Sequence, residues 1–191
     1  MQILAIICYI LALVLIAMAS ESNFVQMETA NLKYSTFKRV SKANASTLVH
    51  LEFRIRQYNL DLLEKLTLDI STPGSEKYGQ HMTKQQVDDL TANPQGQAVV
   101  EAFLTSIHAE VTHKSSNGLI VGASASVEVW DAALAADFSL FQNDKGQEVV
   151  RTPSYSLPTD VAKEVAAVFN TVQFPAPIFG GPKRLHPIEA V

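Results

Sequence analysis

The chain has 191 residues, of which 47% are hydrophobic and 18% are charged. This composition suits one folded domain with a hydrophobic core and excludes a disordered tail. The net charge of −4 provides no basic surface for nucleic acid, so that class of partner is excluded as well.

The first residues have the pattern of a targeting segment. Residues 3–19 carry no charge and end in Ala17-Met18-Ala19, the small-residue pattern after which signal peptidase cuts. We expect a signal peptide over residues 1–19, cleaved between Ala19 and Ser20, and a secretory route to the extracellular space, a lysosome or a vacuole. No Lys or Arg precedes the apolar run, and its length is at the short limit for a spanning helix, so an uncleaved anchor is the alternative.

The next segment, residues 20–45, is predicted to be an N-terminal extension ahead of the main domain. Asn44-Ala45-Ser46 is the single N-glycosylation sequon, so Asn44 is a predicted glycan site. A strand with one buried face is predicted over residues 47–57. Its alternating apolar residues are Val49, Leu51, Phe53 and Ile55.

Two helices are predicted on either side of a connector over residues 75–83. The first helix has Asn59 as its N-cap, and the second has Thr83. Pro73-Gly74 ends the first helix, and Tyr78 is expected to pin the connector to the body of the domain. The apolar positions at helical spacing are Leu60, Leu63, Leu66 and Ile70 in the first helix and Val87 and Leu90 in the second.

A third helix is predicted from Asn93-Pro94 to His108, with one apolar face. A hairpin follows, with strands over residues 111–114 and 119–122. Asn117-Gly118 at its turn would supply the two positive φ angles that a tight hairpin needs.

The second half of the domain begins with a helix that Ser126 is predicted to cap. Trp130 shares a face of this helix with Val127 and Leu134, and we expect it in the core together with Phe53, Leu63 and Phe103. The later predicted elements are strands over 138–141 and 148–152, joined at 143–146, a helix over 159–169, a short strand over 171–174 and a linker over 176–191.

The order of these elements predicts the fold class. Strand, helix, strand, strand, helix and strand follow one another from residue 47 to residue 141. This order is typical of an α+β fold, the ferredoxin-like split βαβ sandwich, in which two helices cover one face of an antiparallel sheet.

Few residues have the spacing of a chemical site. His108 and His113 lie near each other, but a zinc site needs three or four converging ligands, and the sequence has no His-Glu-x-x-His. Asp88 and Asp89 would point in different directions on a helix. Cleavage of the signal peptide would remove Cys8, the only cysteine. We therefore expect no metal, no cofactor and no disulfide.

Two motifs resemble the activation propeptide of the sedolisins, the serine-carboxyl peptidases that include kumamolisin and tripeptidyl peptidase I. The resemblance covers Leu48 to Pro175, and Met82 stands where the family has leucine. The matching residues are Ser75, Tyr78, Gly79, His81 and Thr83 in the first motif and Arg151, Thr152, Pro153, Tyr155, Leu157 and Pro158 in the second. The family's propeptide is an α/β sandwich, which agrees with the predicted fold.

The resemblance implies a domain that is not an enzyme. The family's catalytic glutamate and aspartate and its Ser-Gly-Thr-Ser segment have no counterpart here. Gly122-Ala123-Ser124-Ala125-Ser126 is the nearest imitation, and a serine without an oriented base does not attack. Ser126 is better explained as a helix cap.

By resemblance, residues 46–175 form a propeptide domain that inhibits a sedolisin catalytic domain or assists its folding, and that is released in acid. Phe174-Pro175 and the following linker would lie along the peptidase cleft, and the free chain would be a monomer. One alternative is a truncated pre-pro-tripeptidyl peptidase, which the apparent stop at Ala190-Val191 favours. Another is a secreted binding module for an unrelated partner.

Overall fold

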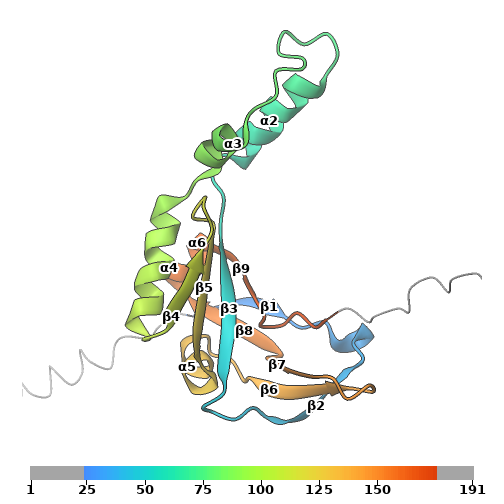
Figure 1. Cartoon of the computed structure of the whole chain (residues 1–191), viewed down its shortest axis with the longest axis vertical. Coiled ribbons are helices and arrows are strands. Elements are labelled where there is room, and N and C mark those ends of the chain that lie inside the picture. Colours follow the sequence, from blue (N-terminus) through green and yellow to red (C-terminus); the bar gives the residue numbers. More distant parts are fainter. Residues whose placement is uncertain (1–23, 176–191) are drawn as a thin grey trace, which may run out of the picture.

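The structure is a computed structural model that describes residues 24–175 (Figure 1). The strands are β1 (Phe24–Thr29), β2 (Phe37–Lys42), β3 (Leu48–Ile55), β4 (Glu110–Lys114), β5 (Ile120–Ser126), β6 (Ser139–Asn143), β7 (Glu148–Arg151), β8 (Ser154–Pro158) and β9 (Val165–Phe169). The helices are η1 (Leu32–Tyr34), a 3-10 turn, and α2 (Leu60–Ser71), α3 (Lys84–Thr91), α4 (Pro94–Ser106), α5 (Val127–Ala133) and α6 (Thr159–Glu164). Within residues 24–175 no helix is both long and apolar enough to cross a membrane.

A four-stranded antiparallel sheet organises the body of the domain. Its strand order is β4-β5-β3-β9. When β3, β4, β5 and β9 are numbered 1 to 4 along the chain, their spatial order is 2-3-1-4. In the sequence, α4 lies between strands 1 and 2, and α5 lies between strands 3 and 4. This is the split βαβ arrangement, so the predicted α+β fold with an antiparallel sheet is confirmed.

The fourth strand of that sheet is not the predicted one. The predicted helix over residues 159–169 stops at Glu164, and β9 continues from Val165 along the edge of β3. Val165 and Val168 are fully buried there. Valine fits a half-buried strand at least as well as a helix, and pairing with β3 decides between the two. The predicted strand over residues 171–174 is absent. Thr171 Oγ1 instead donates a hydrogen bond to the Val168 carbonyl at 2.6 Å.

Smaller sheets extend the body at one end (Figure 1). β2, β6 and β7 form a three-stranded sheet, and β1 pairs with β8. The predicted strands over 138–141 and 148–152 are confirmed as β6 and β7, joined by a turn at Gly146, whose φ is 77°. The pairing of β1 with β8 and of β2 with β6 ties residues 24–42 to the rest of the domain.

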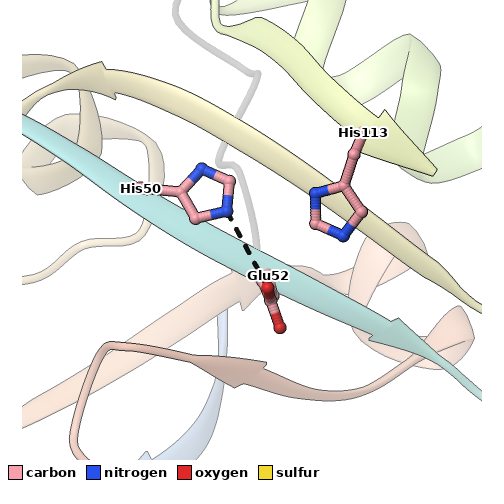
Figure 2. A group of neighbouring side chains, drawn as sticks. All are labelled: His50, Glu52 and His113. Atoms are coloured by element: carbon pink, nitrogen blue, oxygen red, sulfur yellow. Dashed lines mark ion pairs between the residues drawn. The ribbon is translucent and has the colours of Figure 1, made fainter. Parts of the chain in front are cut away.

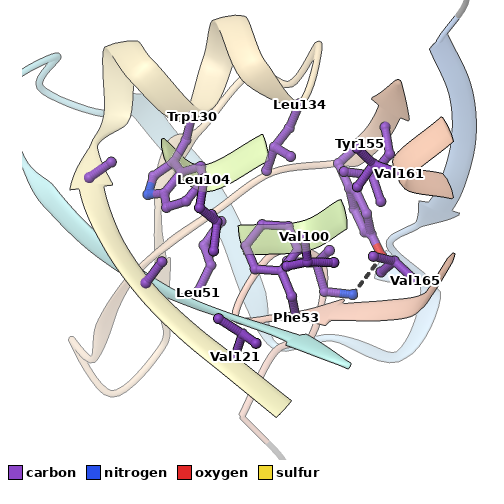
Figure 3. Close-up of a cluster of buried hydrophobic side chains, with 14 of the residues drawn as sticks. Leu51, Phe53, Val100, Leu104, Val121, Trp130, Leu134, Tyr155, Val161 and Val165 are labelled. Atoms are coloured by element: carbon purple, nitrogen blue, oxygen red, sulfur yellow. Dashed lines mark hydrogen bonds between the residues drawn. The ribbon is translucent and has the colours of Figure 1, made fainter. Parts of the chain in front are cut away.

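The core lies between the sheet and helices α4 and α5 (Figure 3). Trp130 is completely buried, its ring centre lies 6.0 Å from that of Phe53, and its Nε1 donates to the Val49 carbonyl at 2.9 Å. Phe103 packs against this cluster, as predicted. The expectation that Leu63 joins it is wrong, because α2 lies outside the body.

Residues 60–91 form a helical arm that extends away from the body (Figure 1). None of the residues of α2 is buried. The Tyr78 side chain is 57% exposed, so the prediction that it pins the connector to the body is wrong. The ends of the arm meet at the body, where the Tyr58 amide donates to the Thr91 carbonyl at 3.2 Å.

The two predicted caps of the arm differ in outcome. Thr83 begins α3 with a capping box: its side chain accepts from the Gln86 amide, and the Gln86 side chain accepts from the Thr83 amide. Asn59 stands at the N-cap position of α2, as predicted, but it has a φ of 55° and its side chain makes no capping bond. Its amide group donates to the Leu90 carbonyl at 2.8 Å and thereby links the two helices.

Two other local predictions are corrected. In the turn between β4 and β5 only Gly118 has a positive φ, of 70°, because Asn117 acts through its side chain, which accepts from Ser115 Oγ at 2.8 Å. Ser126 stands immediately before α5 but makes no side-chain capping bond, since it is also the last residue of β5 and pairs with Leu48.

Candidate functional site

The second sequence motif, residues 151–158, is built into the body. Arg151 Nε donates to the carbonyl of Gln173 at 2.7 Å, and its Nη2 contacts Asn170 Oδ1 at 3.4 Å. Burial lowers the pKa of the Arg151 guanidinium, because the charged form loses water. Thr152 is buried, and its amide donates to the Thr171 carbonyl. These contacts fasten the chain after β9 to the sheet.

Tyr155 is the centre of the same motif (Figure 3). Its ring is fully buried, its hydroxyl accepts from the Val168 amide at 2.9 Å, and it donates to Glu28 Oε2 at 3.4 Å. Burial raises the pKa of Tyr155 well above its ordinary value.

The rest of the motif is structural as well. Leu157 is fully buried, the Pro153 carbonyl accepts from the Ala30 amide at 2.7 Å, and Pro158 immediately precedes α6. The packing of the body therefore accounts for this motif.

The first motif lies at the tip of the helical arm, far from the second in the fold (Figure 1). Ser75 Oγ accepts from the Lys77 amide at 3.2 Å, and the Gly79 amide donates to the Ile70 carbonyl at 3.0 Å. Gly79 has a φ of 76°, which a residue with a Cβ rarely adopts. His81 is exposed. Local bonds thus shape the loop, and core packing does not explain its side chains.

The arm also exposes large apolar side chains. They gather on one short helix and the loop beyond it, whereas scattered single residues are normal on protein surfaces. The exposed fractions are 50% for Leu60, 46% for Leu62, 61% for Leu68 and 57% for Tyr78. Exposed apolar side chains on a projecting helix are available as anchors for contact with another protein.

The face of the four-stranded sheet opposite the core carries polar side chains, and we call it the open sheet face. It includes His50, Glu52 and Arg54 of β3, which alternate with buried residues, and Ser124 of β5 and His113 of β4. His50 Nδ1 lies 3.2 Å from Ser124 Oγ, and its Nε2 lies 3.9 Å from Glu52 Oε1. The His50 and His113 rings stack with centres 5.9 Å apart (Figure 2).

The sequence prediction missed this group of side chains because it compared His113 with His108. The exposed His108 follows α4 with a φ of 56°, whereas His113 meets His50 across two neighbouring strands. The strand period does place His50 and Glu52 on one face. Only the register of β4 against β5 brings His113 to them.

Ser124, His50 and Glu52 are arranged in the serine, histidine and carboxylate order of a catalytic triad. Ser124 therefore has a neighbouring base, which the sequence did not predict. The surroundings do not fit acyl transfer. Ser124 pairs with His50 on one side and with Glu110 on the other, so the backbone amides of this strand are engaged in the sheet. An oxyanion needs amides that point freely at it.

Phe174 is held by the body. Its ring centre lies 4.9 Å from that of Phe141 and 5.6 Å from that of Phe37. A segment that reaches a peptidase cleft would therefore start after Phe174, and Pro175 is the last described residue. The exposed Asn44 lies in the turn between β2 and β3, where Ser46 Oγ donates to its Oδ1 at 2.9 Å.

The predicted signal cleavage between Ala19 and Ser20 lies outside the described residues.

The strand order and the two helices on one face define the class as ferredoxin-like α+β domains. Within that class, the chain can be assigned to one family. The family model of the pro-kumamolisin activation domain matches residues 35–174, and the chain belongs to this family.

The relatives that the chain matches include tripeptidyl-peptidases and physarolisin. The chain is 24% identical over 160 residues to tripeptidyl-peptidase sed4 of Aspergillus fumigatus, covering 84% of this chain and 26% of that protein. It is 26% identical over 146 residues to physarolisin of Physarum polycephalum, covering 74% and 25% of the two chains. It is 21% identical over 176 residues to the probable tripeptidyl-peptidase SED2 of Trichophyton verrucosum, covering 91% and 30%. The chain therefore spans less than a third of each of these proteins.

Proposed function

We propose that this chain is a propeptide-type domain of the secretory pathway that binds the catalytic domain of a sedolisin-type serine peptidase. It inhibits that peptidase or assists its folding, and it performs no catalysis itself. The carrying observation is the match of residues 35–174 to the pro-kumamolisin activation domain. The fold supports binding, because it displays the open sheet face and the helical arm.

Three parts of the chain would share the docking. The open sheet face offers charged and polar groups, with Arg54 exposed and Glu52 half-exposed. The arm offers apolar side chains, of which Leu68 is the most exposed in α2. The segment after Phe174, anchored by Phe37 and Phe141, would enter the cleft. Apolar anchors with a polar surround are the usual anatomy of a protein interface.

Release in acid follows from the charge balance. The chain has 19 acidic residues, 15 Lys and Arg residues and 5 His residues, so its formal charge of −4 becomes strongly positive in acid. A carboxylate paired with a cation of the partner has a lowered pKa in the complex. Its contribution to binding is present above its free pKa of about 4 and is lost as the pH falls through the bound value.

The alternatives from the sequence remain separable by experiment. The chain spans only 25% to 30% of the relatives described above, so it could act as part of a longer pre-pro-tripeptidyl peptidase without independent activity. It could also be a secreted module that binds an unrelated partner. We favour a free monomer that binds the peptidase as a separate chain.

The test is inhibition in trans. The secreted chain and a version ending at Pro175 would each be incubated at pH 7 and at pH 4 with a mature sedolisin tripeptidyl peptidase, and residual activity measured in a short acid pulse. The shorter version stops at Pro175 so that the contacts of Arg151 with Gln173 and of Phe141 with Phe174 are kept.

We expect full inhibition after incubation at pH 7 and weaker inhibition after incubation at pH 4, where the paired carboxylates begin to take up protons. An absence of both binding and inhibition at pH 7 would refute the proposed partner. Equal inhibition at both pH values would refute acid release alone. Equal inhibition by the shorter version would remove only the role of the tail.

A further inference from the structure

We propose that His50, Glu52 and His113 on the open sheet face form a binding site for Zn²⁺. One ligand atom from each of the three side chains can be chosen so that all lie within 4.8 Å of one another (Figure 2). Two imidazoles and a carboxylate are donors that suit zinc, and three protein ligands leave a fourth position for water.

The register of the sheet brings these three side chains together. Glu52 of β3 pairs with Gly122 of β5, and Gly122 pairs with His113 of β4, so the three positions form one row across the sheet. The middle position has no side chain. Glu52 and His113 can therefore lean toward each other over Gly122, while His50 approaches from the next outward position of β3.

Gly122 is necessary for the arrangement of the rings. A Cβ placed at Gly122 would lie 2.3 Å from His113 Nδ1 and 3.0 Å from His50 Cε1. Real Cβ atoms do not approach other atoms as closely as 2.3 Å, so any larger residue would push the His113 ring away. The glycine thus provides the space in which two imidazoles stack on the sheet.

Neighbouring hydroxyls orient the His50 ring. Its Nδ1 lies 3.2 Å from Ser124 Oγ and 3.4 Å from Thr112 Oγ1, while its Nε2 faces Glu52 Oε1 at 3.9 Å. Zinc-bound histidines usually have their second ring nitrogen held by an outer polar group. The hydroxyls fill this role for His50, which leaves Nε2 to bind the metal.

The three ligand atoms need only a small movement to reach the geometry of a zinc site. Zinc bonds of about 2.0 to 2.2 Å place neighbouring tetrahedral ligand atoms about 3.3 Å apart. His113 is exposed, and the side chains of His50 and Glu52 are 38% and 36% exposed. Rotation of these side chains can close the difference without moving the strands.

The test uses the full chain expressed in a secretory host without a histidine tag, stripped with EDTA and transferred to chelator-free buffer at pH 7.5. Zn²⁺ would be titrated calorimetrically, with Ca²⁺ and Mg²⁺ as hard cations that prefer oxygen ligands. We expect one Zn²⁺ per chain and no matching signal with the other two ions. Co²⁺ loading should give the visible absorption of a tetrahedral site.

Variants locate the site. His50→Ala, Glu52→Gln and His113→Ala should each lower zinc affinity by about 10-fold or more. Gly122→Ala should do the same with all three ligands still present, because it displaces the His113 ring. His81→Ala, an exposed histidine at the tip of the arm, is the matched control and should leave affinity unchanged.

Thermal unfolding of each variant would verify that it is folded. No Zn²⁺ binding by the folded parent chain would overturn the proposal, and so would affinity unchanged in both His50→Ala and His113→Ala. Equal binding of Ca²⁺ would also overturn the proposal, because Ca²⁺ prefers oxygen ligands and would then be bound by surface carboxylates without the histidines. The site is measured on the free chain, so its failure leaves the proposed peptidase partner untouched.

Discussion

At the scale of single residues, Trp130 holds α5 on the sheet through packing against Phe53 and a hydrogen bond to the Val49 carbonyl. Trp130→Ala should lower the free energy of unfolding by about 3 to 5 kcal/mol, since it leaves a large cavity in a closed core. Urea unfolding followed by circular dichroism measures this. Trp130→Phe, which keeps a ring, should cost less, and near-parent stability of the alanine variant would contradict the packing.

Tyr155 predicts a dependence on alkaline pH. Burial raises its pKa, so the folded state holds the phenolic proton more tightly than the unfolded state does. The stabilisation is therefore complete below the ordinary tyrosine pKa of about 10 and is lost as the pH rises through the folded value.

In Tyr155→Phe the Val168 amide loses the hydroxyl that accepts its bond, which should cost about 1 to 3 kcal/mol at neutral pH. The variant should also lose less stability between neutral pH and pH 11 than the parent chain. Urea midpoints over that range measure both effects. Parallel pH profiles for the two chains would rule out this role of Tyr155.

Ser124 tests the claim that the chain is not an enzyme. Although His50 Nδ1 lies 3.2 Å from its hydroxyl, the strand around it provides no free amide pair for an oxyanion. The secreted chain should release no tripeptide from a fluorogenic substrate at acid pH and should match Ser124→Ala in rate. Hydrolysis that Ser124→Ala abolishes would show that the chain is a hydrolase.

At the scale of elements, the sequence predicted best those segments whose own pattern matches their surroundings. β3 alternates strictly because one face is buried, and α4 has a single apolar side, so both were predicted close to their observed bounds. β9 was mistaken for helix, because its valines recur at helical spacing and its strand form depends on pairing with a distant part of β3.

The helical arm was predicted as two helices but placed wrongly. Apolar spacing identifies helix, yet it does not say which partner covers the apolar side. The exposed side chains of α2 are consistent with a partner outside the described residues. The zinc-site residues were missed for a similar reason, since their meeting depends on strand register.

The capping box of α3 should control the local stability of the arm. Thr83→Ala removes the acceptor of the Gln86 amide, which should cost about 1 kcal/mol and speed amide exchange in α3 about fivefold. Thr105→Ala, an exposed threonine late in α4, is the matched control. The urea midpoint of the body should stay the same in both variants. Unchanged exchange in α3 of Thr83→Ala would contradict the cap.

At the scale of the whole molecule, the structure separates a packed body from an arm whose residues take no part in the hydrophobic core. The hydrogen bonds between them include those from the Tyr58 amide to the Thr91 carbonyl, from Gln57 Nε2 to Thr91 Oγ1 at 3.4 Å, and from Asn117 Nδ2 to Asp88 Oδ1 at 3.3 Å. The hydrogen bond from Lys84 is the largest cause that lowers the pKa of Asp88, so this carboxylate is charged at neutral pH. A body that folds without its arm is the expected consequence.

The last prediction follows from that separation. Replacing residues 60–90 by a short Gly-Ser linker should leave a folded body, because Tyr58 and Thr91 already meet across the gap. We expect a Tm within about 5 °C of the parent and a smaller urea m value, since less surface is exposed on unfolding. Affinity for the peptidase at pH 7 should fall by at least about 10-fold, because the exposed leucines of α2 and Tyr78 would be absent. Loss of cooperative unfolding would show that the arm belongs to the folded unit, and unchanged affinity would exclude it from the docking surface.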